Sequence, residues 1–198
     1  MSATALLRPG LLTDTSLLIA GPSPPAPLGN AVAEAFSELG AQVRACLPDG
    51  EDEAAIDDAV ADVIAGGGVI DVLVVDGPGL FAAAAADHAL RACLDASWNV
   101  TRAVVNHAFL PGGRGGRIVY LAPAPDAGEH AMAARAGLEN LARTLSVEWA
   151  RHRVNTIAIA PGTTTPARDT AAIVAYLASP AGAYFSGCLL DLDATAAP

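Results

Sequence analysis

The sequence contains no lysine, and all 11 of its basic residues are arginine. Any mechanism that needs a lysine ammonium is therefore excluded. Positive charge is scarce overall, because 21 acidic residues give the chain a formal net charge of −10. An acidic chain is repelled by the phosphate backbone of nucleic acids, so we expect no nucleic-acid partner.

Long apolar runs are also absent. Although 53% of the residues are hydrophobic, they do not form the 18 or more consecutive apolar residues that a membrane span requires, so we expect no membrane partner. Residues 1–10 lack the basic start and long apolar stretch of a signal peptide. We therefore expect a cytoplasmic protein that folds as a single domain over residues 1–198.

Cysteine and histidine are too few and too scattered to suggest a metal site. Cys46, Cys93 and Cys188 lie far apart, which indicates free thiols rather than disulfides or metal ligands. Neither His88 nor His107 has a second ligand four residues away. The sequence predicts no metal centre.

The apolar residues that are present come in strand-length runs separated by helical segments. Residues 117–122 and 154–160 are two such runs, typical of strands buried on both faces of a parallel sheet. The segment between them, residues 130–151, predicts a long helix. Its apolar residues at helical spacing are Leu138, Leu141, Ala142, Leu145 and Trp149.

The same alternation of strand and helix continues on either side of this unit. Further strands are expected at residues 17–20, 41–47, 69–75 and 187–193, and further helices at 31–39, 53–65, 82–110 and 171–178. This pattern predicts an α/β fold, a doubly wound Rossmann-like parallel sheet of about six strands.

Four segments in the right order resemble the short-chain dehydrogenase/reductase family. LVVDGPG (73–79) resembles the family's Asn-Asn-Ala-Gly strand end, and RIVYLAP (117–123) resembles the strand that usually ends in the catalytic serine. EWARHRVNTIAIAPG (148–162) resembles the end of the active-site helix with the strand that follows. Residues 172–194 resemble the closing helix and strand. The resemblance implies an NAD(P)-dependent oxidoreductase fold.

The loop that binds phosphate in this family is matched only in part. Gly21 corresponds to the first glycine of Thr-Gly-x-x-x-Gly-Ile-Gly and Leu28-Gly29 to its end, while Pro27 replaces the middle glycine. Prolines at 22, 24, 25 and 27 lack the N–H groups that bind phosphate at a helix start. We interpret the segment as a rigid strand-to-helix connection without a dinucleotide.

The resemblance places the other cofactor contacts at the ends of later strands. They fall on Asp49, Asp76, Gly77, Pro161, Gly162 and Thr163. Leu47 stands where the family selects between NAD and NADP, and its side chain can serve neither cofactor. Asp49 follows directly on a strand, so about one βα unit of the family is missing there. The lid that usually follows Thr165 is also nearly absent.

The resemblance places the catalytic tyrosine at Ala131 and the catalytic lysine at Arg135. Ala131 has no proton to give, and arginine is not equivalent to lysine. The family's serine falls on Ala122 or Pro123, and its helix asparagine on Asn99.

Two nearby groups are alternative proton donors. His130 adjoins Ala131, but one residue turns a helical side chain by about 100°. Tyr120 lies on the preceding strand and faces away from the cleft if the pleat is regular.

The leading hypothesis is a degenerate, shortened family member that lacks standard catalysis and serves as a structural or partner subunit. Family members usually associate through helices that correspond to residues 88–110 and 130–151. We therefore expect a homo-oligomer, dimer or tetramer, or a hetero-oligomer with an active relative. The alternatives are an atypical NAD(P)-dependent oxidoreductase acting on a carbonyl or alcohol, and a binding module for another small ligand.

Overall fold

The computed structural model describes residues 6–23, 25–46 and 52–193. Its strands form one parallel sheet in the order β2-β1-β3-β4-β5-β6. The strands are β1 (Ser16–Ala20), β2 (Gln42–Cys46), β3 (Val72–Asp76), β4 (Gly116–Leu121), β5 (Val154–Pro161) and β6 (Cys188–Leu192). The predicted doubly wound sheet of six strands is confirmed.

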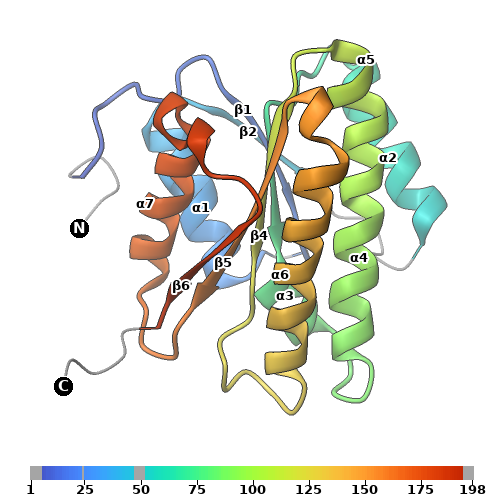
Figure 1. Cartoon of the computed structure of the whole chain (residues 1–198), viewed down its shortest axis with the longest axis vertical. Helices are drawn as coiled ribbons and strands as arrows, with labels where there is room; N and C mark the ends of the chain where they lie inside the picture. Colours follow the sequence, from blue (N-terminus) through green and yellow to red (C-terminus); the bar gives the residue numbers. More distant parts are fainter. Residues whose placement is uncertain (1–5, 24, 47–51, 194–198) are drawn as a thin grey trace.

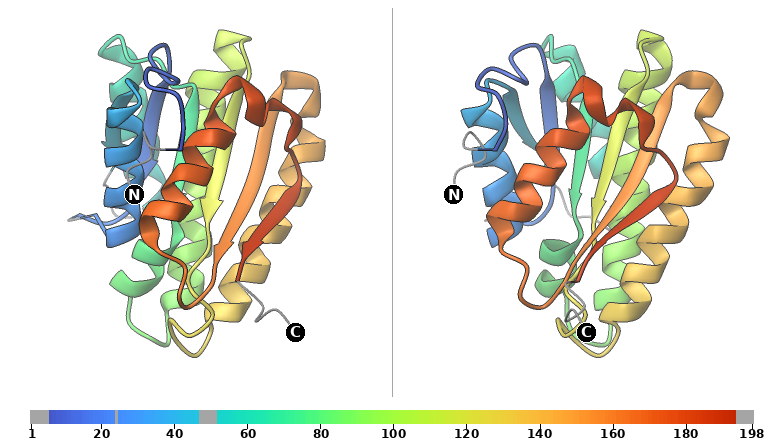
Figure 2. Two further views of the ribbon diagram at one scale, coloured as in Figure 1. Left: turned by 90° about the vertical axis from the view of Figure 1, so that its left-hand side faces the viewer. Right: turned by 60° about the vertical axis from the view of Figure 1, so that its left-hand side comes forward.

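Helices cover both faces of the sheet. They are α1 (Pro27–Glu38), α2 (Glu53–Ala65), α3 (Gly77–Ala83), α4 (Ala89–Val104), α5 (Leu110–Gly112), α6 (Ala131–Glu148) and α7 (Ala167–Ala178). A π-helical turn, η2 (Val105–Phe109), joins α4 to α5, and two short 3-10 segments are η3 (Ala150–His152) and η4 (Pro180–Tyr184). Helices α1 and α7 lie on one face, and α2, α4 and α6 lie on the other (Figures 1 and 2).

Alternating side chains of each strand supply two apolar cores. On β3, Val72 and Val74 point toward α1 and α7, whereas Leu73 and Val75 point toward α2, α4 and α6. Every residue of β3 is buried. This agrees with the prediction, because a strand covered on both faces has no solvent side.

Several element boundaries differ from the sequence prediction. Helix α1 begins at Pro27 rather than at residue 31, because proline at the first helical position has a suitable φ angle and needs no N–H donor. Helix α7 begins at Ala167 rather than at residue 171. Strand β3 begins at Val72 rather than at residue 69. Helix α3 follows β3 directly, whereas the next helix was expected to begin only at residue 82.

Two further expectations concern the membrane and the thiols. In the part of the chain that the structure describes, no helix is both long and apolar enough to cross a membrane. Cys93 and Cys188 are free thiols, as predicted.

Candidate functional site

The carboxyl ends of β1 and β3 lie side by side where the strand order reverses. A doubly wound sheet forms its ligand crevice at this point, and the start of the following helix faces the ligand. Here residues 21–23, 25 and 26, between β1 and α1, and the short helix α3 lie at this point. In Figure 1 this edge lies at the lower end of the sheet, beside α3.

Asp76, the last residue of β3, brings a carboxyl group into this crevice. The residue is only 1% exposed. Its Oδ1 accepts a hydrogen bond of 3.2 Å from the Gly79 N–H and so caps α3. Its Oδ2 is buried and has no hydrogen-bond partner among the described residues. Burial raises the pKa of Asp76, although the N–H groups of Gly79 and Ala26 oppose the rise by favouring the ionised form.

A dinucleotide does not fit the residues at this crevice. Its pyrophosphate needs free N–H donors at the start of α1, and Pro22, Pro25 and Pro27 have none. A phosphate would also approach the buried carboxyl of Asp76, where like charges in a low-dielectric setting repel strongly. The prolines therefore remove part of the donors that a pyrophosphate requires, and the carboxyl adds charge of the unfavourable sign.

Arg135 of α6 occupies the other half of the carboxyl edge. It is 8% exposed. Its Nη1 donates hydrogen bonds to the main-chain carbonyl oxygens of Pro123, at 2.8 Å, and Pro161, at 2.7 Å. Its Nη2 lies 3.6 Å from Asp191 Oδ1. One guanidinium thus joins the ends of β4, β5 and β6. Asp191 gave no signal in the sequence, because it follows Arg135 at a long distance along the chain.

The start of α6 has no acidic group in its first turn. Ala131, to which the resemblance assigns the place of the family's tyrosine, is fully buried. His130 precedes the helix as its N-cap residue, is half-buried, and makes no capping hydrogen bond with its side chain. The helix begins one residue later than the sequence predicted.

Tyr120 and Asn99 are both buried. Tyr120 lies on β4 and faces α4, and Asn99 lies within α4. The Tyr120 side chain is fully buried, and its hydroxyl lies 2.9 Å from Thr101 Oγ1 on α4. Burial raises the pKa of Tyr120 above its ordinary value. The hydroxyl is therefore held in the core between the sheet and α4. Asn99 is 8% exposed and lies within α4.

The loop after β5 is folded onto the end of β6. The Gly162 N–H donates to Thr165 Oγ1 at 3.0 Å, and that hydroxyl donates to the Leu192 carbonyl oxygen at 2.9 Å. Thr163 is exposed. Thr165 thus holds the turn closed against the sheet.

The remaining candidates have structural surroundings or lie outside the described residues. Leu28 packs in the core beneath α1 and α7. Gly77 lies against the Leu121 carbonyl oxygen at the end of β4, with no room for a side chain. Leu47 and Asp49 fall outside the described residues. The described part of the chain contains no group of three or more His, Cys, Asp or Glu side chains that could bind a metal ion.

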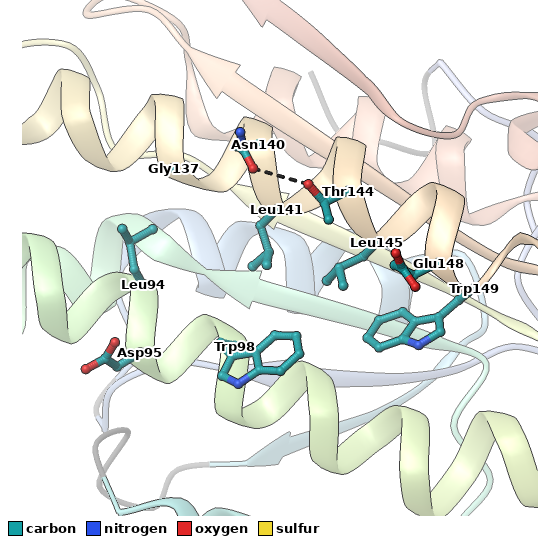
Figure 3. Close-up of a pocket in the computed structure, with 10 residues that line it drawn as sticks. All are labelled: Leu94, Asp95, Trp98, Gly137, Asn140, Leu141, Thr144, Leu145, Glu148 and Trp149. Carbon is teal, nitrogen blue, oxygen red and sulfur yellow. Dashed lines mark hydrogen bonds between the residues drawn. The ribbon is translucent and has the colours of Figure 1, made fainter.

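A second feature is a groove of about 690 Å³ between α4 and α6 (Figure 3). Leu141 and Leu145 of α6 extend toward Trp98 of α4, which is 41% exposed. The lining consists of apolar residues with polar groups among them: Leu94, Asp95, Trp98, Gly137, Asn140, Leu141, Thr144, Leu145, Glu148 and Trp149. The apolar stripe predicted on α6 is therefore shared between the core and this groove.

Comparisons with known proteins agree with the fold. The family profile described as short chain dehydrogenase matches residues 25–173. A citronellol catabolism dehydrogenase from Pseudomonas aeruginosa is similar, with a TM-score of 0.78 and 25% identity over 96% of this chain and 98% of that chain. No curated protein matches the chain by sequence.

Two further solved structures are similar at lower identity and show the fold alone. A short chain dehydrogenase from Mycobacterium smegmatis has a TM-score of 0.77 and 22% identity, over 95% of each chain. A hydroxysteroid dehydrogenase from Escherichia coli has a TM-score of 0.75 and 18% identity, over 93% of this chain and 98% of that chain.

The bracing role of Arg135 predicts a large loss of stability when it is truncated. Arg135→Ala should lower the free energy of unfolding by about 3 kcal/mol, because buried acceptors lose their donor. Arg135→Lys should recover only part of this loss, since a single ammonium lacks the planar fork. Urea unfolding measures both. Arg168→Ala is the control, because Arg168 forms an exposed pair with Asp169 and should change stability by less than about 0.5 kcal/mol. An equally small loss of stability for Arg135→Ala would show that Arg135 does not hold the strand ends together.

The buried acid predicts a dependence of stability on pH. The folded pKa of Asp76 is raised above its ordinary value of 3.8. The stability that this raised pKa contributes is therefore fully present below pH 3.8 and is lost as the pH rises to the folded pKa. The loss amounts to about 1.4 kcal/mol for each pH unit between the two pKa values. Asn does not titrate, so the stability of Asp76→Asn relative to wild type should increase from about pH 4 to pH 7. Urea unfolding across this range tests it, and a difference that is constant or shrinks would refute the raised pKa.

Proposed function

Because the chain belongs to the short-chain dehydrogenase family, we propose that it is a member that has lost the family's standard catalysis and acts as a partner subunit. Hydride transfer to a carbonyl needs a proton donor beside the oxygen. The observation that carries the proposal is the fully buried methyl group of Ala131, at the position of the family's tyrosine. A methyl group has no proton to donate.

The surroundings of Arg135 support the same proposal. The family's lysine lowers the pKa of the tyrosine and must have its charge directed toward the cleft. The guanidinium of Arg135 instead donates to the carbonyl oxygens of Pro123 and Pro161. Its hydrogen bonds hold strand ends together, so its charge serves the fold and not a reacting group.

We further propose that this member is shortened relative to the family at two places. At the first, β2 is an edge strand of the described sheet, so the family's strand beyond it has no counterpart among the described residues. At the second, only residues 162–166 separate β5 from α7. A lid normally excludes water from a hydride transfer, and so short a connection cannot form one.

The groove between α4 and α6 supports a partner role. A half-exposed tryptophan and several leucines line it, which is the composition of an interface centre. Its surroundings carry both signs of charge, with Arg91 and Arg143 on the same helices as Asp95 and Glu139. A two-fold axis through this face would bring the apolar groove of one copy onto that of the other. We therefore propose a dimer through α4 and α6.

Sedimentation velocity tests the partner role. Wild type should sediment as a dimer or larger species, and Trp98→Glu should sediment as a monomer with an unchanged circular dichroism spectrum, because it places a charge at the interface centre. Tyr184→Glu is the control: Tyr184 is 93% exposed on η4, outside the groove, and its replacement should leave association unchanged.

A wild-type chain that is monomeric alone but associates with an active relative would replace the homodimer by a mixed complex. A chain that is monomeric in both conditions would refute the partner role.

A further inference from the structure

Three glycines surround the buried carboxyl of Asp76. A Cβ atom added to Gly29 would lie 2.5 Å from Asp76 Oδ2, and one added to Gly79 would lie 2.6 Å from the same oxygen. A Cβ atom added to Gly21 would lie 2.9 Å from Asp76 Cβ. Real Cβ atoms do not approach other atoms so closely, so none of these positions accepts a side chain while Asp76 keeps its place.

Backbone conformation does not explain why glycine stands at these three positions. None of the three is among the glycines with a positive φ angle. Gly29 lies within α1 and Gly79 within α3, where alanine is the more favourable residue. The physical requirement that they share is space for the side chain of Asp76.

The position of this space gives it a functional meaning. In the Rossmann fold, glycines of the first turn let the backbone approach a pyrophosphate at the start of the first helix. Here Gly21 and Gly29 hold the same places in the turn and the helix, yet the group they approach is the chain's own carboxyl. The Pro22 ring closes the crevice further, since its Cδ lies 2.7 Å from a Cβ added at Gly79.

We propose that the Asp76 side chain fills the crevice in which this fold holds a ligand phosphate, and that Gly21, Gly29 and Gly79 are glycines in order to admit it. The crevice is thereby closed to phosphate ligands both by volume and by charge. This inference rests on the packing around Asp76, so it stands or falls independently of the proposed partner role.

The charged and titratable groups around Asp76 are few. Cys93 of α4 faces it and responds to it, because burial and the charge of Asp76 raise the pKa of this thiol to about 12. Helix α3 has no charged residue, and the first on α1 is Glu34, beyond its first turn. The carboxyl therefore has no cationic partner in the neighbouring helices, and packing together with the N–H groups of Gly79 and Ala26 holds it in the crevice.

A double-mutant cycle followed by thermal unfolding tests the proposal. Gly29→Ala alone should lower Tm by about 5 °C or more, because the new methyl group collides with Asp76 Oδ2. In the Asp76→Ala background the same substitution should leave Tm unchanged or raise it, since the oxygen is gone and alanine favours the helix. In the Asp76→Asn background, where the side chain keeps its size, Gly29→Ala should still lower Tm.

Gly112→Ala is the matched control, because a Cβ atom at Gly112 meets nothing within 4 Å and should not change Tm in any background. If Asp76→Ala does not fold, Asp76→Ser removes the same oxygen contact and completes the cycle. The proposal is overturned if Gly29→Ala is tolerated in wild type. It is equally overturned if the loss in Tm is the same with and without the Asp76 carboxyl.

Discussion

The carboxyl edge of the sheet depends on one buried guanidinium. Arg135 carries a charge that it cannot lose, and a charge with so little exposure needs acceptors within reach. It finds them in the carbonyl oxygens of Pro123 and Pro161, while Asp191 lies close enough for an ionic attraction. Because these acceptors follow or belong to three different strands, α6 is fixed against the ends of β4, β5 and β6 at once. On the proposed account, the arrangement that satisfies the arginine also removes it from any reacting centre.

The other half of the same edge follows a similar rule. Asp76 fills the space between β1, α1 and α3. Thr165 joins the loop after β5 to the end of β6. Polar groups that face a ligand in a binding protein are here directed at the chain itself. The exposed apolar surface lies elsewhere, in the groove between α4 and α6. On the proposed account, the fold has kept its surface for association and has closed the cleft in which its relatives do chemistry.

The sequence was sufficient for the layers of this fold but not for the contacts at its edge. Buried parallel strands are continuous apolar runs, so 117–122 and 154–160 could be recognised locally. Helix α3 was missed because Gly77-Pro78-Gly79 is typical of a turn, whereas in the structure Asp76 caps a helix with Pro78 in its first turn. The acceptors of Arg135 are set by tertiary packing, and no local pattern indicates them.

The most direct measurement is a calorimetric titration of the purified protein with NADH and with NADPH. The account predicts no binding of either cofactor at millimolar concentration, because prolines replace donors in the turn before α1 and the crevice already holds a carboxyl. A dissociation constant in the micromolar range would contradict it. Such binding would mean that the turn between β1 and α1 opens to admit a pyrophosphate, and the chain would then have to be treated as an oxidoreductase with an unusual proton donor.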